Sequence, residues 1–564
     1  MAWQKVARAN ALGDGKVVGV EVDGTPVALY RIGDAVYATE GTCTHAEALL
    51  ADGWVEDGEI ECPLHQARFD IRTGKALCEP AIEDLRTYAV KVEAGDVLID
   101  LGRPGTVRGQ ASPTPAEPLA KAEVGGGTTA QTDRNREALT SGAPRTGAGD
   151  NGTLFSRQYV WPGDDLTRIP DWVYTDNDIY EREVERIFHG RTWNYVALEA
   201  EVANAGDFIR SNVGPTPVVV ARAEDGSINV FENRCRHRAA EYCRELSGTT
   251  KEFVCPYHQW TYSLKGDLIG VPFRWGVAGK GGMPADFRLE SHGLRKLNVT
   301  THRGVVFASY AEKMESFADY LGPEVLSEFE ATFDGRKLKV LGHYRHSLPG
   351  NWKLYHENLK DPYHATLLHT FLVTFGLLVA GNRSLMLTDA TGRHGVMASA
   401  KSDAKAVSSD TKKEMRAYKE GMTLREPRFM DFVAEFDSPW SVTMSTIWPN
   451  LIVQREMNTL GVRQIVPTGP HEFIMKWTMF GFEGDDEEMT RHRLRQGNLM
   501  GPAGFLGLED NEAIKFVQDG MQRIPNGEHL VKLDPATAAG TSDTLISESA
   551  IRAMYKYWRQ EMGL

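Results

Sequence analysis

The feature that most constrains this chain is a pattern of cysteine and histidine that occurs twice. Each copy has a Cys-x-His pair and a Cys-x-x-His pair, with sixteen residues between the pairs in the first copy and seventeen in the second. The first copy consists of Cys43, His45, Cys62 and His65, and the second of Cys235, His237, Cys255 and His258. Because each pair comes from one short loop, two converging loops bring two thiols and two imidazoles together. The sequence therefore predicts two metal sites of the same composition.

Two thiolates and two imidazoles suit a [2Fe–2S] centre in which histidines replace two cysteines on one iron and raise the reduction potential. Structural zinc is the alternative, because Cys2His2 sets also bind Zn2+. Zinc fingers usually place two cysteines before a pair of histidines, whereas here each loop carries one of each. The pattern favours two [2Fe–2S] clusters.

The similarity between the two copies extends beyond the ligands. Alternating segments around a turn, at 27–38 and 218–231, precede the first loop of each copy and predict β-hairpins. An aromatic residue, Phe69 or Tyr262, stands four residues after the last histidine. The copies are offset by 192 to 193 residues, which predicts two examples of one small β-domain.

Length and composition set the overall organisation. A chain of 564 residues with 41% apolar and 25% charged residues has room for about three globular domains. Its net charge of -14 argues against nucleic acid or an anionic membrane as partner. No apolar run reaches the length of a membrane span and no signal-peptide core follows Met1, so the expected location is the cytoplasm.

A change of composition marks the main domain boundary. Residues 103–151 are rich in Gly, Pro and Thr and contain no Ile, Phe, Trp or Tyr. Such a segment cannot bury a core and predicts a flexible tether. We expect a first domain at 1–102, a linker at 103–153, the second cysteine–histidine domain at 154–310 and a further domain at 311–564.

A third site is predicted in that last domain. His364 and His369 lie five residues apart, and Asp361 precedes them by three. Two histidines and one carboxylate form the facial triad of non-haem Fe(II) oxygenases, although such a set can also be an ordinary polar cluster. Five residues fit poorly to an unbroken helix, so the helix should change direction between the two histidines.

At these residues the chain resembles a known family. Residues from about 155 to 564 resemble the large (α) subunit of Rieske ring-hydroxylating oxygenases of the naphthalene dioxygenase type, and the first hundred residues resemble Rieske ferredoxins. The matching motifs are Asp361-Pro-Tyr-His364 with His369, and Gly501-Pro-Ala-Gly before Asp510. The resemblance implies that His364, His369 and Asp510 hold iron. Glu509 and Glu512 are alternatives to Asp510, and these acids could instead cap a helix.

The resemblance also implies a fold and an electron path. The fold would be multidomain: an all-β Rieske ferredoxin domain, a disordered linker, a second all-β Rieske domain, and an α+β catalytic domain with an antiparallel sheet and helices, of the helix-grip (START-like) kind. Asp361 would carry electrons from a Rieske cluster of a neighbouring subunit to the iron. Asn358, in the same segment, is a further catalytic candidate.

The resemblance implies the following cofactors and partners. Two [2Fe–2S] clusters and one mononuclear Fe(II) would serve an α3 or α3β3 assembly, the latter with a separate small β subunit. The chain contains no flavin or nicotinamide motif, so an external NAD(P)H-dependent flavin reductase would supply electrons.

The expected reaction inserts oxygen from O2 into an aromatic acid, since the chain looks closest to salicylate 5-hydroxylases and anthranilate dioxygenases. By position, the strand at 441–457 would line the pocket and offer Gln454 and Arg455 to the substrate. The product would gain one hydroxyl or become a cis-dihydrodiol. The alternatives are a dioxygenase acting on benzoate or a polycyclic hydrocarbon, and a non-catalytic Rieske electron-transfer or redox protein.

Overall fold

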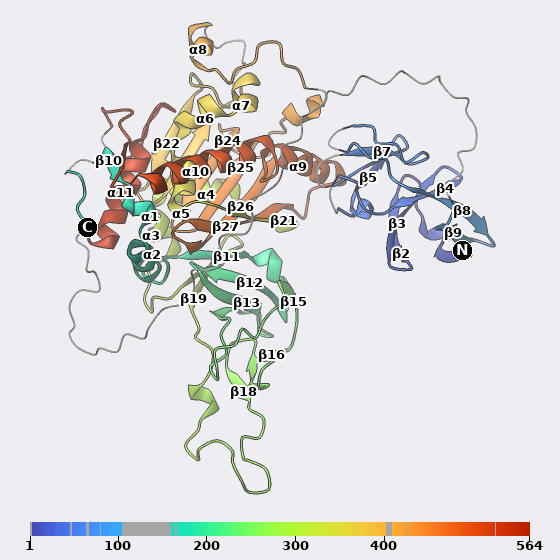
Figure 1. The fold of residues 1–564 in the computed structure, drawn as a ribbon, viewed down its shortest axis with the longest axis horizontal. Helices are drawn as coiled ribbons and strands as arrows, with labels where there is room; N and C mark the ends of the chain where they lie inside the picture. Colours follow the sequence, from blue (N-terminus) through green and yellow to red (C-terminus); the bar gives the residue numbers. More distant parts are fainter. Residues whose placement is uncertain are drawn as a thin grey trace, which may run out of the picture. The chain divides into compact units, whose positions relative to one another are not determined.

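The structure is a computed structural model that describes residues 3–45, 48–63, 67–78, 81–103, 159–163, 166–401, 409–424, 426–524, 526–537 and 539–564. The chain divides into two compact units, Met1–Gln158 and Tyr159–Leu564 (Figure 1). Except for Arg103, the predicted linker lies outside the described residues, as does His65.

The first unit contains the first cysteine–histidine repeat, and its described residues form β-strands and two short 3-10 helices, Ala9–Ala11 and Leu50–Asp52. A six-stranded antiparallel sheet has the order β1-β9-β8-β4-β3-β2. Its strands are β1 (Gln4–Arg8), β2 (Val17–Val22), β3 (Thr25–Ile32), β4 (Ala35–Glu40), β8 (Thr87–Glu93) and β9 (Asp96–Asp100). A smaller sheet consists of β5 (Trp54–Glu56), β6 (Glu59–Glu61) and β7 (Arg68–Asp70). Strands β3 and β4 form the predicted hairpin.

The second repeat also consists of small antiparallel sheets. The first joins β12 (Asp207–Val213), β13 (Thr216–Arg222), β14 (Ile228–Glu232) and β15 (Ser247–Thr249). The second joins β16 (Glu252–Val254), β17 (Thr261–Ser263) and β18 (Leu268–Gly270), and the third joins β11 (Asn194–Leu198), β19 (Asn298–His302) and β20 (Val305–Ser309). The second predicted hairpin is therefore confirmed as β13 and β14.

One backbone hydrogen bond recurs in all four cysteine loops. In each loop the amide of the cysteine donates to the carbonyl of the residue five positions later. The pairs are Cys43 to Ala48 at 2.9 Å, Cys62 to Ala67 at 2.8 Å, Cys235 to Ala240 at 2.8 Å and Cys255 to Trp260 at 2.9 Å. The two repeats thus share this backbone hydrogen bond as well as their sequence pattern.

A seven-stranded antiparallel sheet forms the body of the second unit, with the order β21-β27-β26-β25-β24-β23-β22. The strands are β21 (Leu338–Leu348), β22 (Ser384–Thr388), β23 (Gly395–Ser399), β24 (Val442–Ile447), β25 (Leu451–Glu456), β26 (Thr459–Gly469) and β27 (Glu472–Phe482). The predicted single strand at 441–457 is therefore two strands, β24 and β25, joined by a turn.

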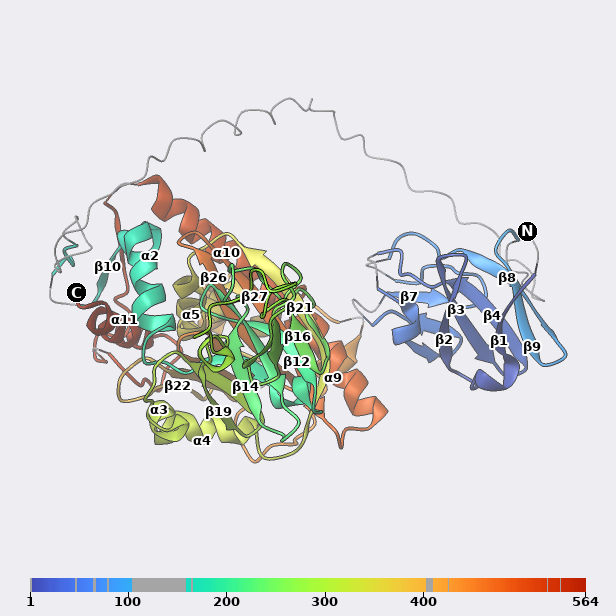
Figure 2. The ribbon, with the colours of Figure 1, turned by 90° about the horizontal axis from the view of Figure 1, so that it is seen from below.

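Each face of this sheet is covered by different elements. One core includes side chains of the sheet and of α5 (Trp352–Lys360), α10 (Phe505–Arg523) and α11 (Ser549–Met562) (Figure 1). The other includes α3 (Phe317–Leu321), α4 (Pro323–Thr332) and strands β11 and β20 of the second repeat (Figure 2). The second repeat is therefore packed directly on the catalytic sheet.

Residues at the start of the second unit belong with the sheet and its helices. This segment contains β10 (Arg168–Pro170), α1 (Trp172–Thr175) and α2 (Asn177–Glu183), and β10 pairs with β28 (Glu528–Leu530). Glu183 is buried and accepts hydrogen bonds from the indole nitrogens of Trp352 (2.8 Å) and Trp558 (2.7 Å). The sequence pattern predicted that this segment, from residue 154, belongs with the second repeat. The contacts place it against α5 and α11 instead, because the buried carboxylate of Glu183 needs the donors that these helices supply.

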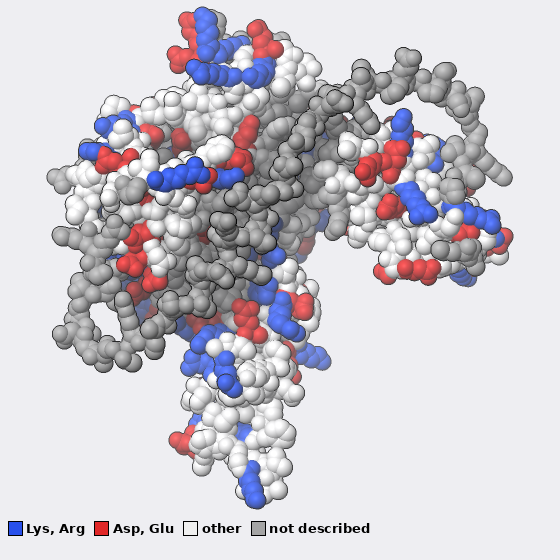
Figure 3. Space-filling model, viewed as in Figure 1, with Lys and Arg blue, Asp and Glu red and all other residues white. Residues whose placement is uncertain are grey.

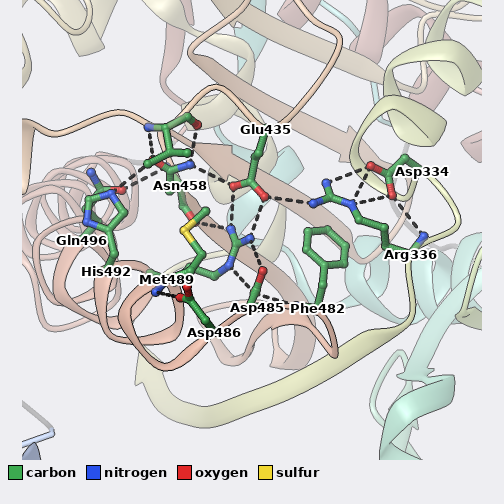
Figure 4. A network of polar contacts seen from close by, with 12 residues as sticks. Asp334, Arg336, Glu435, Asn458, Phe482, Asp485, Asp486, Met489, His492 and Gln496 are labelled. Carbon is green, nitrogen blue, oxygen red and sulfur yellow. Dashed lines mark hydrogen bonds and ion pairs between the residues drawn. The ribbon is translucent and has the colours of Figure 1, made fainter.

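A buried network of charges fastens α9 (Glu487–Met500) to the sheet (Figure 4). The Arg493 guanidinium binds Glu435 at 2.6 and 2.8 Å and Asp485 at 2.7 and 3.0 Å. Arg336, which precedes β21, binds the same Glu435 at 3.2 Å. Removing one member would leave an uncompensated buried charge, which typically costs 3–5 kcal/mol, so roughly that much stability depends on this network.

Two observations bear on partners. No helix in the described part of the chain has the length and apolarity needed to cross a membrane. Figure 3 shows acidic and basic side chains interspersed on the face that it presents, without a continuous basic stripe.

Candidate metal centre

His364 and His369 lie on either side of a break between two short helices. His364 is on α6 (Pro362–Leu368), and α7 (Thr370–Thr374) begins after His369. His369 has extended backbone angles, φ −81° and ψ 94°. The predicted change of direction between the histidines is confirmed. Asp361 starts α6 by accepting the backbone amides of Tyr363 (3.0 Å) and His364 (3.2 Å).

Asp510 reaches the histidines from α10. Its Oδ1 atom lies 3.3 Å from His364 Nε2 and 3.2 Å from His369 Nε2. One ligand atom from each of the three residues can be chosen so that all lie within 4.8 Å of one another, and no other such set of three His, Cys, Asp or Glu occurs among the described residues. The structure therefore brings together the three residues that the sequence pattern selected.

The turn before α10 explains the Gly501-Pro-Ala-Gly504 motif. A Cβ on Gly504 would lie 2.0 Å from the carbonyl oxygen of Leu499, and one on Gly501 would lie 2.4 Å from that of Gly497. Larger residues cannot occupy these positions without moving the backbone. The two glycines let α9 end close to the start of α10, which positions Asp510.

A second carboxylate faces each imidazole on its other nitrogen. His369 Nδ1 lies 2.7 Å from Glu509 Oε2, and His364 Nδ1 lies 3.5 Å from Asp361 Oδ2. The Glu509 contact is a hydrogen bond of the kind that fixes the ring orientation and tautomer of a metal-binding histidine, whereas His364 Nδ1 has no hydrogen-bond partner. Sequence reasoning considered Glu509 only as an alternative ligand. The available signal was its position directly before Asp510 on a helix. Neighbouring residues on a helix point in different directions, so Glu509 can contact a histidine from another side than Asp510 does.

The electrostatics of this cluster favour a bound cation. Burial alone would lower the pKa of His364, but its contacts with Asp361 and Asp510 raise that pKa to about 10. Burial would raise the pKa of Asp510, yet its hydrogen bonds to the two imidazoles hold that pKa well below its ordinary value. Three carboxylates around two imidazoles therefore attract positive charge, which protons or a metal ion can supply.

The donor set fits a mononuclear iron. Two imidazole nitrogens and one carboxylate oxygen converge, and each imidazole has a carboxylate behind it, so His364, His369 and Asp510 would hold the ion. Bound there, Fe(II) would supply the ability to bind and activate O2 at its open positions. Asn358 Nδ2 lies 3.3 Å from His364 Nε2 and 3.1 Å from Asp510 Oδ1, which places this predicted catalytic residue beside the same centre.

A small, mostly apolar cavity of about 50 Å³ adjoins the three residues. Leu372, Met397 and Met444 are among its apolar side chains. Glu456 and Arg463, on β25 and β26, supply its other charged groups. An apolar cavity with few charged groups is typical of a site for a small organic substrate.

The two predicted pocket residues lie elsewhere than expected. Gln454 is buried and donates to Glu456 Oε2 at 2.8 Å, so it lies behind a residue that lines the cavity. Arg455 points to the opposite face of the sheet, where it donates to Ser438 at 2.8 Å. Successive residues of a strand face opposite sides, so Arg455 cannot share the cavity with Glu456. The cation that lines the cavity is Arg463.

The second cysteine–histidine site is fully described. Cys235 and Cys255 are buried, and the rings of His237 and His258 lie side by side nearer the surface, with centroids 4.4 Å apart. Trp260 stacks on His237 at 4.8 Å. Buried thiols paired with outer imidazoles fit a cluster in which each pair binds its own iron.

The first site is described in part. Cys43 and Cys62 are buried and His45 is exposed, as in the second site. His65 lies outside the described residues. The three described residues and the shared loop hydrogen bonds match the second repeat.

Comparisons with known proteins agree with this arrangement. The family model "Rieske [2Fe-2S] domain" matches residues 2–89 and 192–278. The model "Ring hydroxylating alpha subunit (catalytic domain)" matches residues 335–564. Domains of these families bind a Rieske cluster and a mononuclear iron, so the chain carries both kinds of cofactor.

Similar proteins cover the second unit. The large oxygenase component of salicylate 5-hydroxylase from Ralstonia sp is 46% identical over 418 residues, which are 73% of this chain and 98% of that protein. The large subunit of anthranilate 1,2-dioxygenase from Burkholderia cepacia is 40% identical over 404 residues, 72% of this chain and 95% of that protein. The solved naphthalene 1,2-dioxygenase from Rhodococcus sp. bound to indole covers 70% of this chain and 94% of its own, with a TM-score of 0.58 and 24% identity, and supports the fold.

Proposed function

Because this chain belongs to the family of Rieske non-haem iron ring-hydroxylating oxygenase large (α) subunits, we propose that it hydroxylates an aromatic carboxylic acid of the salicylate or anthranilate kind. Both relatives are named for an aromatic acid with an ortho substituent. The observation that carries the proposal is a buried cation, Arg463, in the wall of the cavity beside the iron-binding residues.

Arg463 is 3% exposed and lacks a full set of partners. Its Nη1 donates to the Tyr355 hydroxyl at 2.7 Å, and its guanidinium lies 3.8 Å from the centre of the Trp477 ring. Its Nε has no hydrogen-bond partner, and within the described residues no salt bridge joins it to a carboxylate. A buried cation is costly unless it is paired. A substrate carboxylate would pair with it by strong, charge-assisted hydrogen bonds.

Turnover of a panel of compounds tests this assignment. The full-length protein, an NADH-dependent Rieske reductase and O2 are incubated with salicylate, anthranilate, benzoate and naphthalene, and products are identified by mass and ring position. We expect the ortho-substituted acids to be oxidised fastest. Faster oxidation of naphthalene than of any acid would overturn the proposal.

The same panel distinguishes a second candidate, a dihydroxylating dioxygenase. The relatives include both a hydroxylase and a 1,2-dioxygenase, and both reactions use the same set of iron ligands in this family. A product with one added hydroxyl supports the first candidate. A cis-dihydrodiol, or a catechol formed with loss of the ortho substituent and of the carboxyl group as CO2, supports the second.

We further propose that both repeats hold a [2Fe–2S] cluster and act in series. The first repeat, a fused ferredoxin-like domain, would take electrons from an NAD(P)H-dependent flavin reductase and pass them to the second repeat. Asp361 would then connect the cluster of a neighbouring subunit to His364, in an α3 or α3β3 assembly. Asp361 suits this role because it contacts His364 and also lines a second cavity, on the side of α10. The seven-stranded sheet with α10 and α11 is what we assign to the helix-grip class.

A further inference from the structure

Glu357 is a carboxylate close to the iron-binding residues that the proposed iron site does not use. It lies on α5, immediately before Asn358, and accepts a hydrogen bond from the Tyr555 hydroxyl of α11. The two residues come from helices almost 200 positions apart in the sequence. Their contact is therefore a product of the tertiary fold.

This contact is the inner end of a continuous series of polar groups. The Tyr555 hydroxyl lies 2.7 Å from the Tyr174 hydroxyl of α1, and that hydroxyl lies 3.3 Å from His529 Nε2 of β28. His529 Nδ1 lies 3.2 Å from Asp171 Oδ1. Four elements thus contribute one series of hydrogen bonds that runs from Asp171 to Glu357.

Both ends of the series line the same cavity, Asp171 and His529 at one end and Glu357 at the other, and they differ in exposure. At the outer end, the side chain of His529 is 30% exposed. Tyr174 and Tyr555, in the middle, are fully buried. At the inner end, Glu357 lines a cavity together with Asn358, Asp361 and His364. The series therefore runs through buried hydroxyls beside this cavity, from the partly exposed His529 to the immediate neighbourhood of the iron-binding residues.

The reaction of this family requires such a connection. Hydroxylation consumes O2, two electrons and two protons and releases water, and dihydroxylation consumes the same two electrons and two protons. The clusters bring electrons but no protons. A half-buried site must therefore receive two protons from solvent in each turnover, whichever product it forms.

We propose that five residues form a proton relay: Asp171, His529, Tyr174, Tyr555 and Glu357. The relay supplies protons to the second cavity at the place where Asn358, Asp361 and His364 line it. A solvent acid protonates the His529–Asp171 pair, and His529 gives a proton to the Tyr174 oxygen as Tyr174 gives its own proton to Tyr555. Tyr555 likewise passes its proton to Glu357, whose carboxyl group releases one proton into the cavity beside Asn358. One proton enters, one leaves, and no electron moves.

The charges around the series are compatible with this role. Burial raises the pKa of the Tyr174 and Tyr555 hydroxyls well above their ordinary value, so they stay protonated and transfer protons without remaining ionised. Burial also raises the pKa of Glu357, which favours a carboxyl group able to donate. Lys353, one turn earlier on α5, forms an ion pair with Glu183 at 2.7 Å. The other charged side chains around this cavity are Asp361, Glu528 and Glu548.

The test uses the full-length holoenzyme and the Tyr555→Phe variant, which removes one oxygen atom and keeps the ring. We expect product formation to fall at least tenfold, with a larger solvent deuterium isotope effect, while iron content and both cluster signals stay unchanged. Tyr557→Phe, on the same helix but outside the series, is the matched control and should keep the wild-type rate. Wild-type rates and isotope effects in Tyr555→Phe would overturn the relay.

A second variant tests the outer end and remains informative if Tyr555→Phe does not fold. His529→Gln should lower the rate similarly, and added imidazole should restore it, because a small base can replace the missing side chain in proton transfer. A rate that falls without any rescue, or that does not fall, contradicts the relay.

Infrared spectroscopy provides a readout that requires no substrate. The protein should show the carboxyl C=O band of protonated Glu357, which Glu357→Gln removes and Tyr555→Phe shifts to higher frequency through loss of a hydrogen bond. Absence of any band that depends on Glu357 would count against the relay. Because this measurement is independent of turnover, it separates failure of the relay from failure of the proposed substrate class.

Discussion

The two cysteine–histidine repeats share the backbone hydrogen bond of their loops and differ at one position beside the thiols. In the second repeat, the Tyr262 hydroxyl lies 3.1 Å from Cys235 Sγ, and it accepts the backbone amide of Arg236 at 3.1 Å. The equivalent residue of the first repeat, seven positions after Cys62, is Phe69, which has no hydroxyl. Hydrogen bonds to the sulfur atoms are one of the factors that set the potential of an iron–sulfur cluster. Under the proposed function, the Tyr262 hydroxyl should therefore raise the potential of the second cluster.

The repeats also differ in their attachments. The first belongs to a compact unit of its own, Met1–Gln158. The second is bound to the catalytic sheet, where Asn450 exchanges hydrogen bonds with the Tyr195 backbone at 2.8 and 3.0 Å and Gln464 donates to Ser211 at 3.1 Å. The difference teaches that the same sequence pattern occurs in two structural settings, one a separate compact unit and one packed against the large sheet.

The largest expected effect is on the iron centre alone: losing a ligand there should remove the mononuclear iron and leave the clusters of both repeats in place. His364→Ala should lose the mononuclear iron and at least a hundredfold of product formation, because one of three ligands is removed. Metal analysis and EPR of the reduced protein measure iron and clusters separately. His343→Ala, an exposed histidine on β21, is the control. Retention of both iron and product in His364→Ala would show that the triad is not the catalytic site.

Removing the first repeat tests whether it has a role of its own. Deletion of residues 1–150 should reduce NADH-driven product formation by about a hundredfold, because the entry point for electrons is lost while the iron site remains. A Rieske ferredoxin added in trans should restore turnover. Undiminished turnover without that addition would remove the first repeat from the electron path.

Substrate selection should depend on the body of the second unit and not on either repeat. Arg463→Gln should lower kcat/KM for the aromatic acid by about 10- to 100-fold, since a charge-assisted hydrogen bond is worth about 1.5–3 kcal/mol. The corresponding amide should lose much less, and Arg455→Gln, which faces away from the cavity, serves as the matched control. Equal losses for acid and amide would contradict carboxylate binding by Arg463.

The smallest expected effect concerns the Tyr262 hydroxyl, which has no counterpart on Phe69 of the first repeat. Tyr262→Phe should lower the potential of the second cluster by roughly 20–60 mV, the equivalent of one hydrogen bond of about 0.5–1.5 kcal/mol. Phe69→Tyr should raise the potential of the first. Protein-film voltammetry measures both. A second cluster with the lower potential in the wild-type protein would refute the proposed direction of flow.

Local sequence was enough wherever the chemistry depends on spacing along the chain. The two Cys-x-His and Cys-x-x-His patterns predicted two repeats, the alternating segments 27–38 and 218–231 predicted their β-hairpins, and both hairpins are present. The five-residue spacing of His364 and His369 predicted the break between α6 and α7. These inferences succeed because a turn or a helix relates residues that are close in sequence by a fixed geometry.

The tertiary structure decided the features that depend on which side of a strand or helix a side chain lies on. Arg455 and Arg463 are equally plausible in a list of strand residues, but only the register of β25 and β26 turns Arg463 towards the cavity. Glu509 faces His369, and Tyr555 reaches Glu357, because helices distant in sequence pack together. The sequence by itself determined the spacing of the cysteines and histidines that predict metal sites, whereas Asp510 was selected through the resemblance to a family. The fold decided which cation faces the cavity and which polar groups connect the centre to solvent, because such contacts join residues that no local spacing relates.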